Sequence, residues 1–313
     1  MKISKMNKYS LANIRSDFRS NWLLYVMVLP AIVFYIMFAY IPMIGNTMAF
    51  IEYTPGIGFK GFFVGEWKGL EYLVEFVNNI NFVRLMRNTL LISFYNLIFG
   101  FPAPIILAIL LSELPYNGFK RIAQTITYMP HFVSTVVICG LIVNFSLSTG
   151  LFSDISEFFG GERISFLQDS KYFRTIYVGS GIWQNIGWNS IIYLSAITSI
   201  DGALYEAAVI DGANKPQQIW HVTIPGISST IIILLILQIG QMMTIGAEKV
   251  MLLYNPSIYE TSDVISTYVY RKGIVEMNWS FSASVDLFNK VINFVLLVSA
   301  NYISKRFGDT SLM

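Results

Sequence analysis

Long apolar runs alternate with shorter polar segments along the whole chain. Six of these runs reach or come close to the length of about 20 apolar residues that one helix needs to cross a bilayer core roughly 30 Å thick. They cover residues 22–43, 88–112, 122–147, 175–200, 227–247 and 287–303. The pattern therefore predicts an all-α membrane protein with six transmembrane helices.

The first run predicts a spanning helix and not a cleaved signal peptide. It is long, bulky and aromatic, whereas a signal peptide has a shorter apolar region and a small-residue cleavage site. Basic residues outnumber the single acidic residue in the preceding segment 1–21, which predicts a cytoplasmic tail. Six spans return the chain to that side, and Lys305 and Arg306 agree with a second cytoplasmic tail over 306–313. Residues 22–305 then form the transmembrane domain.

Three long connections fall on the outer side of the membrane in this topology, at 46–84, 148–174 and 248–286. They mix acidic and basic residues with aromatic residues and glycines, which suits folded loops better than linkers. Lys120 and Arg121 place the connection between the second and third runs on the cytoplasmic side.

Composition narrows the class of protein. Hydrophobic residues make up 54% of the 313 residues and charged residues only 13%, about half the charged share of a soluble domain, so the chain is an integral membrane protein. The predicted spans hold almost no ionisable side chains, although a carrier driven by an ion gradient usually needs them there. An ion-coupled secondary carrier is therefore the alternative function and not the favoured one.

Catalytic chemistry has no support in the sequence. Cys139 is the only cysteine, and His131 and His221 are far apart, so neither a disulfide nor a metal site is expected. The sequence contains no Walker A pattern, so ATP hydrolysis is not expected of this chain. We expect no catalytic residues, no cofactor bound by this chain and no nucleic-acid partner.

Neutral polar and aromatic residues mark the predicted spans. Gln184 and Trp188 are four residues apart, as are Asn185 and Asn189, and this spacing places each pair on one helical face. Such amides either hold transmembrane helices together or line a path for an uncharged, hydroxyl-rich solute beside indole rings. The candidate path residues are Trp183, Gln184, Asn185, Trp188, Asn189, Gln238, Gln241 and Asn293.

The segment 206–225 is a tightly specified connection between two apolar runs. It is rich in small residues and carries a single lysine, Lys215, unlike a helix that lies on anionic lipid. Gly212 allows a sharp change of direction and Pro216 suits the first turn of a helix, which predicts a helix, a break and a second helix. We interpret the segment as a docking element for another protein, with an ordinary helical loop as the alternative.

This segment resembles the EAA motif of the membrane-spanning subunits of bacterial ABC importers, which act in binding-protein-dependent transport. The matching residues are Glu206-Ala207-Ala208, Asp211-Gly212-Ala213 and Ile224-Pro225. Trp220 stands where the motif commonly has a bulky aromatic residue. Together with the segment 254–271, the chain from residue 22 onward is most similar to the LplB-type oligosaccharide permeases of the carbohydrate-uptake branch.

The resemblance implies the type I ABC importer permease fold, with a cytoplasmic coupling helix in the loop 201–226 between the fourth and fifth spans. The implied ATPase-coupling residues are Glu206, Ala207, Ala208, Asp211, Gly212, Ala213, Trp220 and Pro225. The implied function is ATP-driven import of a carbohydrate, an oligosaccharide, across the bacterial cell membrane, with both termini in the cytoplasm. The implied partners are a second related permease, two ABC ATPase subunits that bind ATP and Mg²⁺, an extracytoplasmic solute-binding lipoprotein and membrane lipid.

Overall fold

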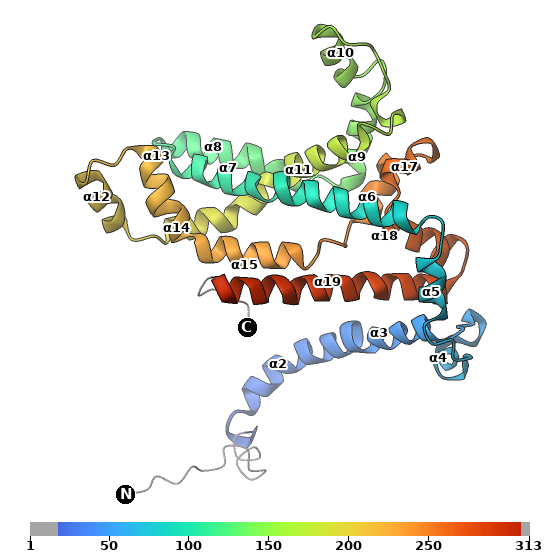
Figure 1. Ribbon diagram of the computed structural model, residues 1–313. Helices are drawn as coiled ribbons and strands as arrows, with labels where there is room; N and C mark the ends of the chain where they lie inside the picture. Colours follow the sequence, from blue (N-terminus) through green and yellow to red (C-terminus); the bar gives the residue numbers. More distant parts are fainter. Residues whose placement is uncertain (1–17, 308–313) are drawn as a thin grey trace, which may run out of the picture.

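The protein is an extended bundle of helices in the computed structural model, which describes residues 18–307 (Figure 1). Within that range the regular elements are helices, and strand pairing is limited to one isolated bridge between Ile51 and Trp67. The predicted all-α class is confirmed. The predicted tails 1–21 and 306–313 lie outside the described residues, except for residues 18–21, 306 and 307.

The N-terminal helix runs without interruption from Trp22 to Phe50. Its parts are α2 (Trp22–Tyr35), the π-helical η1 (Ile36–Tyr40), α3 (Ile41–Met43) and the 3-10 helix η2 (Ile44–Phe50). The apolar side chains of α2 are exposed, and only η2 packs closely against the last helix (Figure 1). A helix that is apolar on all sides is stable in hydrocarbon or against another protein, and not in water.

Three long helices form the middle of the bundle. α6 (Phe82–Tyr95), η4 (Asn96–Gly100) and α7 (Pro102–Ser112) make one helix, which packs extensively against α11 (Phe173–Thr198). α19 (Trp279–Phe307) lies beside α15 (Ser228–Ile239) and η2 and extends past the predicted domain end at residue 305. The inner core between α7, α11 and α15 contains Ala108, Leu111, Tyr193, Leu194, Ile197 and Ile227.

Two of the predicted spans are bent. α8 (Asn117–Tyr128) with η5 (Met129–Phe132) meets α9 (Thr135–Phe145) at 96°. Pro130 lies in the last turn before this bend, and the Ser134 hydroxyl caps the new helix by accepting from the Val137 amide. A helix over 215–226, made of α13 (Lys215–Gln218), η7 (Ile219–Thr223) and α14 (Ile224–Gly226), meets α15 (Ser228–Ile239) at 62°.

The fifth predicted span, 227–247, is wrong at its outer end, because α15 stops at Ile239. The non-helical segment that follows is held by two side chains of α19. Asn293 Oδ1 accepts from the Met243 amide at 2.8 Å, and Asn289 Nδ2 donates to the Met243 carbonyl at 2.9 Å. Side chains thus supply the hydrogen bonds that the helix no longer provides, as irregular backbone away from water requires.

Among residues 18–307, three helices are long and apolar enough to cross a membrane, at Trp22–Phe50, Phe82–Ser112 and Trp279–Arg306. The two bent pairs raise the number to as many as five. The fourth predicted span coincides with α11, whose 26 residues extend about 39 Å, but α11 contains no stretch as apolar as those of these three helices. The count of six spans therefore stays a prediction.

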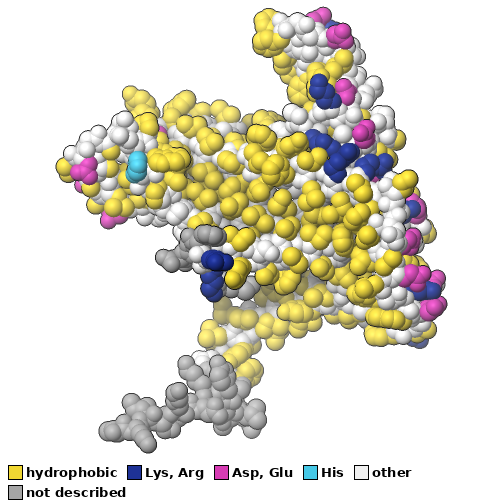
Figure 2. Space-filling model, viewed as in Figure 1, with side chains coloured by type: hydrophobic (Ala, Val, Ile, Leu, Met, Phe, Trp, Pro, Cys, Tyr) yellow, Lys and Arg dark blue, Asp and Glu magenta, His cyan; other side chains and the backbone are white. Residues whose placement is uncertain are grey.

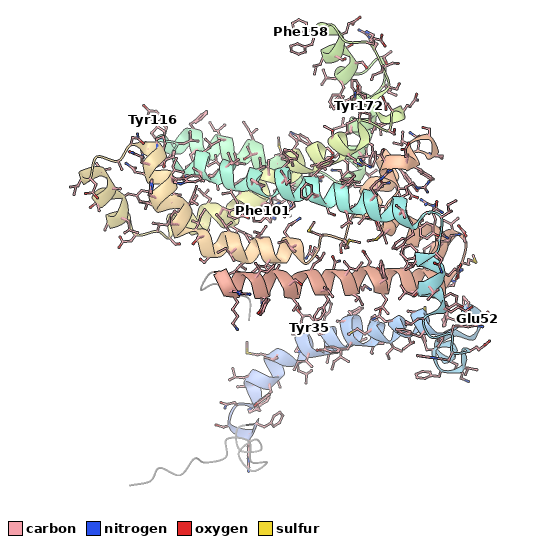
Figure 3. All side chains as sticks on the ribbon, viewed as in Figure 1. Tyr35, Glu52, Phe101, Tyr116, Phe158 and Tyr172 are labelled. Atoms are coloured by element: carbon pink, nitrogen blue, oxygen red, sulfur yellow. The ribbon has the colours of Figure 1, made fainter. Side chains whose placement is uncertain are left out.

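Hydrophobic side chains cover the middle of the molecule and charged ones gather at its two ends (Figure 2). One end carries α12 (Gly202–Ile210) and the C-terminal end of α19 (Figure 1). The opposite end is formed by short helices: η3 (Pro55–Lys60), α4 (Gly61–Val64), α5 (Glu71–Val77), η6 (Phe166–Gln168), α16 (Ala247–Leu253), η8 (Pro256–Ile258), α17 (Tyr259–Ser262), α18 (Ile265–Tyr270) and η9 (Arg271–Val275). α10 (Leu151–Phe158) projects from this end as an arm, with Phe158 near its tip and Tyr172 at its base (Figure 3).

Candidate functional site

Two adjoining cavities of about 230 Å³ each lie between the helix Phe82–Ser112 and α11. Both are lined by Asn96, Gly100, Pro104 and Asn189. The first cavity extends to Gln238 and Gln241 at the end of α15, and it also contacts Phe101, which Figure 3 shows at the middle of the bundle. The second cavity extends to Gln184, Asn185 and Lys249. The structure therefore brings together amides from three separate helices.

The local sequence explains why these side chains meet. Asn96, Gly100 and Pro104 recur every four residues, so they follow one face of their helix. Gly181, Asn185 and Asn189 repeat the same spacing on α11, which packs against that face. The result is a polar seam between two otherwise apolar helices.

The amides at the cavities differ in whether protein groups already satisfy them. Asn185 Nδ2 donates to the Gly181 carbonyl, and Asn185 Oδ1 lies 3.0 Å from His131 Nδ1, which therefore carries the proton. Gln184 Nε2 donates to the Val133 carbonyl at 3.4 Å. In the part of the chain that the structure describes, the side-chain amides without a hydrogen-bond partner at these cavities are Asn96, Asn189, Gln238 and Gln241. These four groups are free to bind a polar solute.

Three of the predicted path residues lie elsewhere. Trp183 lines a separate, apolar cavity of about 430 Å³ beside Ile138 and Phe145. The Trp188 ring stacks on His131 with centroids 4.7 Å apart and planes within 3°. Asn293 holds the segment after α15, where its Nδ2 also donates to Thr244 Oγ1. The structure does not bring these three side chains to the amide-lined cavities.

Lys249 is a cavity residue that sequence reasoning missed, because it follows the fifth apolar run and was assigned to an outer loop. In the structure α16 lies outside the candidate membrane spans but packs against α9. Lys249 Nζ donates to the Tyr177 carbonyl at 3.0 Å and lies 4.9 Å from the centre of the Tyr177 ring. Burial lowers the pKa of Lys249 to about 8.

A second candidate site lies at the far end of the bundle, in the segment 201–226. The predicted helix, break and helix are confirmed there by α12, a turn at Gly212 and the helix over 215–226. Asp201 caps α12 by accepting from the Ala203 amide, and Gly212 takes a positive φ of 79°. The second helix begins with a reciprocal capping box between Asn214 and Gln217, which sequence reasoning missed.

Three side-chain contacts tie this element to itself and to the bundle. The Tyr205 hydroxyl lies 3.0 Å from Thr223 Oγ1, and Gln218 Nε2 donates to the Ala213 carbonyl at 2.8 Å. Lys215 Nζ forms a 2.9 Å ion pair with Glu113, which follows α7. The element is therefore joined by a side-chain contact to the end of α7, one of the helices that line the cavities.

The other side chains of the element face outward. Glu206, Ala207, Asp211, Gly212 and Pro225 are exposed, whereas Ala208 and Ala213 are half-buried. Two large apolar side chains are also uncovered, since Ile210 is 85% and Trp220 69% exposed. Figure 2 shows this end with both acidic and apolar side chains at its surface. Exposed apolar groups beside acidic ones suit a protein partner.

Comparisons with known proteins place the chain among transport proteins. Residues 100–308 match the family model described as "Binding-protein-dependent transport system inner membrane component". Protein LplB of Bacillus subtilis (strain 168) is 42% identical over 295 residues, which cover 94% of this chain and 92% of that protein. The polygalacturonan/rhamnogalacturonan transport system permease protein YteP of the same organism is 40% identical over 290 residues, covering 92% of this chain and 89% of that one.

Two solved structures are similar over nearly the whole chain. A bacterial ABC transporter involved in the import of the acidic polysaccharide alginate has a TM-score of 0.85 at 41% identity, covering 94% of this chain and 98% of that one. The alginate ABC transporter in complex with an alginate pentasaccharide-bound periplasmic protein has a TM-score of 0.86 at 40% identity, covering 95% and 99%.

Proposed function

This chain belongs to the family of binding-protein-dependent transport system inner membrane components and is a permease subunit of an oligosaccharide ABC importer, and we propose how its two sites divide the work. The amide-lined cavities form this subunit's share of the solute path. The segment 201–226 is the coupling element that receives the motion of a separate ATPase. The observation that carries the first assignment is the set of unpartnered amides at Asn96, Asn189, Gln238 and Gln241.

A sugar path needs groups that exchange hydrogen bonds with hydroxyls without holding them permanently. Neutral carboxamides both donate and accept, and they cost less to keep in a low-dielectric site than charges do. The apolar surfaces of Phe101 and Tyr193 beside the first cavity suit the C–H faces of a sugar ring. The two cavities thus combine the two kinds of contact that an oligosaccharide presents.

The coupling element works as a lever between the ATPase and the path. ATP-driven closure of the partner ATPases moves the docked element, and the Lys215–Glu113 ion pair and the helix over 215–226 carry the displacement into α7 and α15. The bundle then exchanges outward-open and inward-open states around the cavities. Glu206 and the exposed Trp220 are the side chains that contact the ATPase.

The same proposal fixes orientation and partners. The end that carries α12 and the C-terminal end of α19 faces the cytoplasm, and the N-terminus lies on the same side. ATP and Mg²⁺ are bound by two ATPase subunits, and a second permease supplies the other half of the path. The short helices around α17 and the arm α10 face the outside, where a solute-binding protein delivers the oligosaccharide.

The function is tested by import into proteoliposomes. Vesicles that hold the chain with its second permease, its ATPases and its binding protein should take up the oligosaccharide only when ATP is supplied. The chain reconstituted alone with a proton or sodium gradient should take up none. Uptake by the isolated chain would instead support an ion-coupled carrier.

Substitution of the unpartnered amides tests the path. We expect Asn189→Leu and Gln241→Leu each to lower uptake about tenfold, because each variant removes one hydrogen bond to the solute. Both variants should accumulate normally, since these amides bond no protein group. Asn293→Leu is the contrasting variant and should lower accumulation, because the Met243 amide and the Thr244 hydroxyl lose their partner. Undiminished uptake by the first two variants would remove the cavities from the path.

Substitution of Gly212 tests the coupling element. A β-branched residue is strained at a φ of 79°, by about 1–3 kcal/mol, so Gly212→Val should displace α12 from the helix over 215–226. We expect this variant to insert normally into the membrane and to lose most of its ATP-dependent uptake. Gly118→Val is the matched control, because Gly118 is also in open space but lacks the positive φ and lies outside the coupling element. Normal uptake by Gly212→Val would contradict the coupling role.

A further inference from the structure

Lys249 is a half-buried cation without an acidic partner among residues 18–307. Its Nζ has one carbonyl acceptor, that of Tyr177, and lies against the face of the Tyr177 ring. No carboxylate of residues 18–307 comes within ion-pair distance of it. The same side chain lines the second cavity beside Gln184, Asn185 and Asn189.

An uncompensated charge in the interior is costly, because burial removes its hydration without an opposite charge in return. The Lys249 ammonium group has three N–H donors, and one carbonyl and one ring face use only part of this binding capacity. Nearby Gly181 leaves room for Nζ beside α11, since a Cβ at that position would lie 3.3 Å from it. The lysine is thus held at the cavity wall with unused donor capacity.

Carboxylate is the anion that this arrangement fits. Lysine binds as a compact point charge, which suits a single negative charge surrounded by hydroxyl groups. A phosphate group carries up to two negative charges and would be matched better by more than one cation, whereas the second cavity is lined by no arginine and by no cation other than Lys249. The amides around the lysine are suited to the hydroxyls of the same sugar.

We propose that Lys249 is the carboxylate-binding group of the path, so that the imported oligosaccharide contains acidic sugar units. The inference rests on the proposed function and adds the substrate class. It is in line with two similar proteins, whose names refer to polygalacturonan and to the acidic polysaccharide alginate.

The test compares three forms of Lys249 in the complete transporter with its binding protein. The probes are short oligosaccharides of galacturonate and of mannuronate, and the same oligosaccharides with their carboxyl groups reduced to alcohols. Lys249→Met should lower uptake of the acidic probes about 10- to 100-fold, which corresponds to one lost charge-assisted hydrogen bond, and spare the reduced probes. Lys249→Arg should retain uptake of the acidic probes. Lys290→Met, at an exposed lysine paired with Asp286, is the control and should behave as wild type.

The pH profile gives a second readout that a merely structural lysine would not move. With a pKa near 8, the charged fraction of Lys249 falls about tenfold between pH 7 and pH 9, while sugar carboxylates stay ionised. At limiting probe concentration, uptake of the acidic probes by the wild-type transporter should therefore fall between pH 7 and pH 9. Uptake by Lys249→Arg should fall less over the same range. Two titratable groups face the lysine, Cys139 on α9 and Tyr177 on α11. Helix α18, which also packs against α16, has no titratable side chains other than its tyrosines.

The possible failures are distinguishable. If Lys249→Met lowers uptake of acidic and reduced probes equally, or lowers neither, the carboxylate role is wrong and the importer function stands. If the wild-type transporter imports no oligosaccharide of any kind with ATP, the proposed function fails and the inference fails with it.

Discussion

We expect the variant Gly187→Ala to lose most of the folded protein in the membrane. Gly187 is buried in α11 where that helix crosses α8, and a Cβ there would overlap the backbone carbonyl of Thr127. The same atom would lie 2.9 Å from the Tyr128 ring. A backbone carbonyl cannot rotate away as a side chain does, so the two helices must separate. The free energy of unfolding should fall by about 3 kcal/mol, the upper part of the range for overpacked sites.

The measurement is the amount of detergent-stable protein by size-exclusion chromatography, together with the apparent Tm. Gly179→Ala is the matched control, because Gly179 lies on the same helix with nothing within 4 Å of its Cβ position. That variant should equal or slightly exceed wild type, since alanine favours helix over glycine. Equal behaviour of the two variants would show that α8 and α11 do not approach each other as described.

The coupling element was predictable because its signals are local. A glycine that permits a positive φ and a proline suited to a first turn determine where a helix breaks and restarts, whatever surrounds them. The structure has that break at Gly212 and Pro216 in the first turn of α13. The large apolar residues Val209, Ile210 and Trp220 near them are exposed, which is consistent with a docking surface. Its partner is outside the sequence and is proposed from the family.

The amide-lined cavities were only partly predictable, because an amide in a span has two uses that the sequence does not separate. Asn189 and Asn293 both have the spacing of a helical face, but one is unpartnered at a cavity and the other secures irregular backbone. That difference depends on a helix end more than forty residues away in the chain, near Met243. Lys249 was missed for the same reason, since only tertiary packing returns it to the cavities.

Apolar runs likewise specified the positions of helices better than their continuity. Hydropathy does not register the bend at Val133 and Ser134 or the end of α15 at Ile239, because both segments remain apolar. α11 shows the opposite effect, because this long helix carries the cavity amides Gln184, Asn185 and Asn189 and is not among the helices apolar enough to cross a membrane. Polar side chains at a cavity therefore weaken the hydropathy signal of the helix that carries them.

The second large effect is expected at Asp263, which lies among the short helices at the end of the bundle opposite α12. Its carboxylate is fully buried and receives two hydrogen bonds from Arg271, at 2.8 and 2.7 Å, and one from the Thr267 hydroxyl. Arg84 of α6 approaches it at 3.4 Å. Burial acts to lower the pKa of Arg271, but hydrogen bonds and charge from Asp263 outweigh it and raise that pKa. The carboxylate thus joins α6, α17 and η9 and is the counterion of a partly buried guanidinium.

Asp263→Ala should therefore cost about 3–5 kcal/mol, because it leaves Arg271 partly buried without an opposite charge. We expect Asp263→Ala to have a lower Tm and faster proteolysis of the segment 248–286 in intact membranes. Asp286→Ala is the control and should change the Tm and the proteolysis rate only slightly, because Asp286 forms an exposed pair with Lys290. The double variant Asp263→Leu with Arg271→Met separates charge from packing. It removes both ions together, so it should be more stable than Asp263→Ala alone. A double variant as unstable as the sum of its single variants would show that shape, and not the unpaired charge, determines the loss.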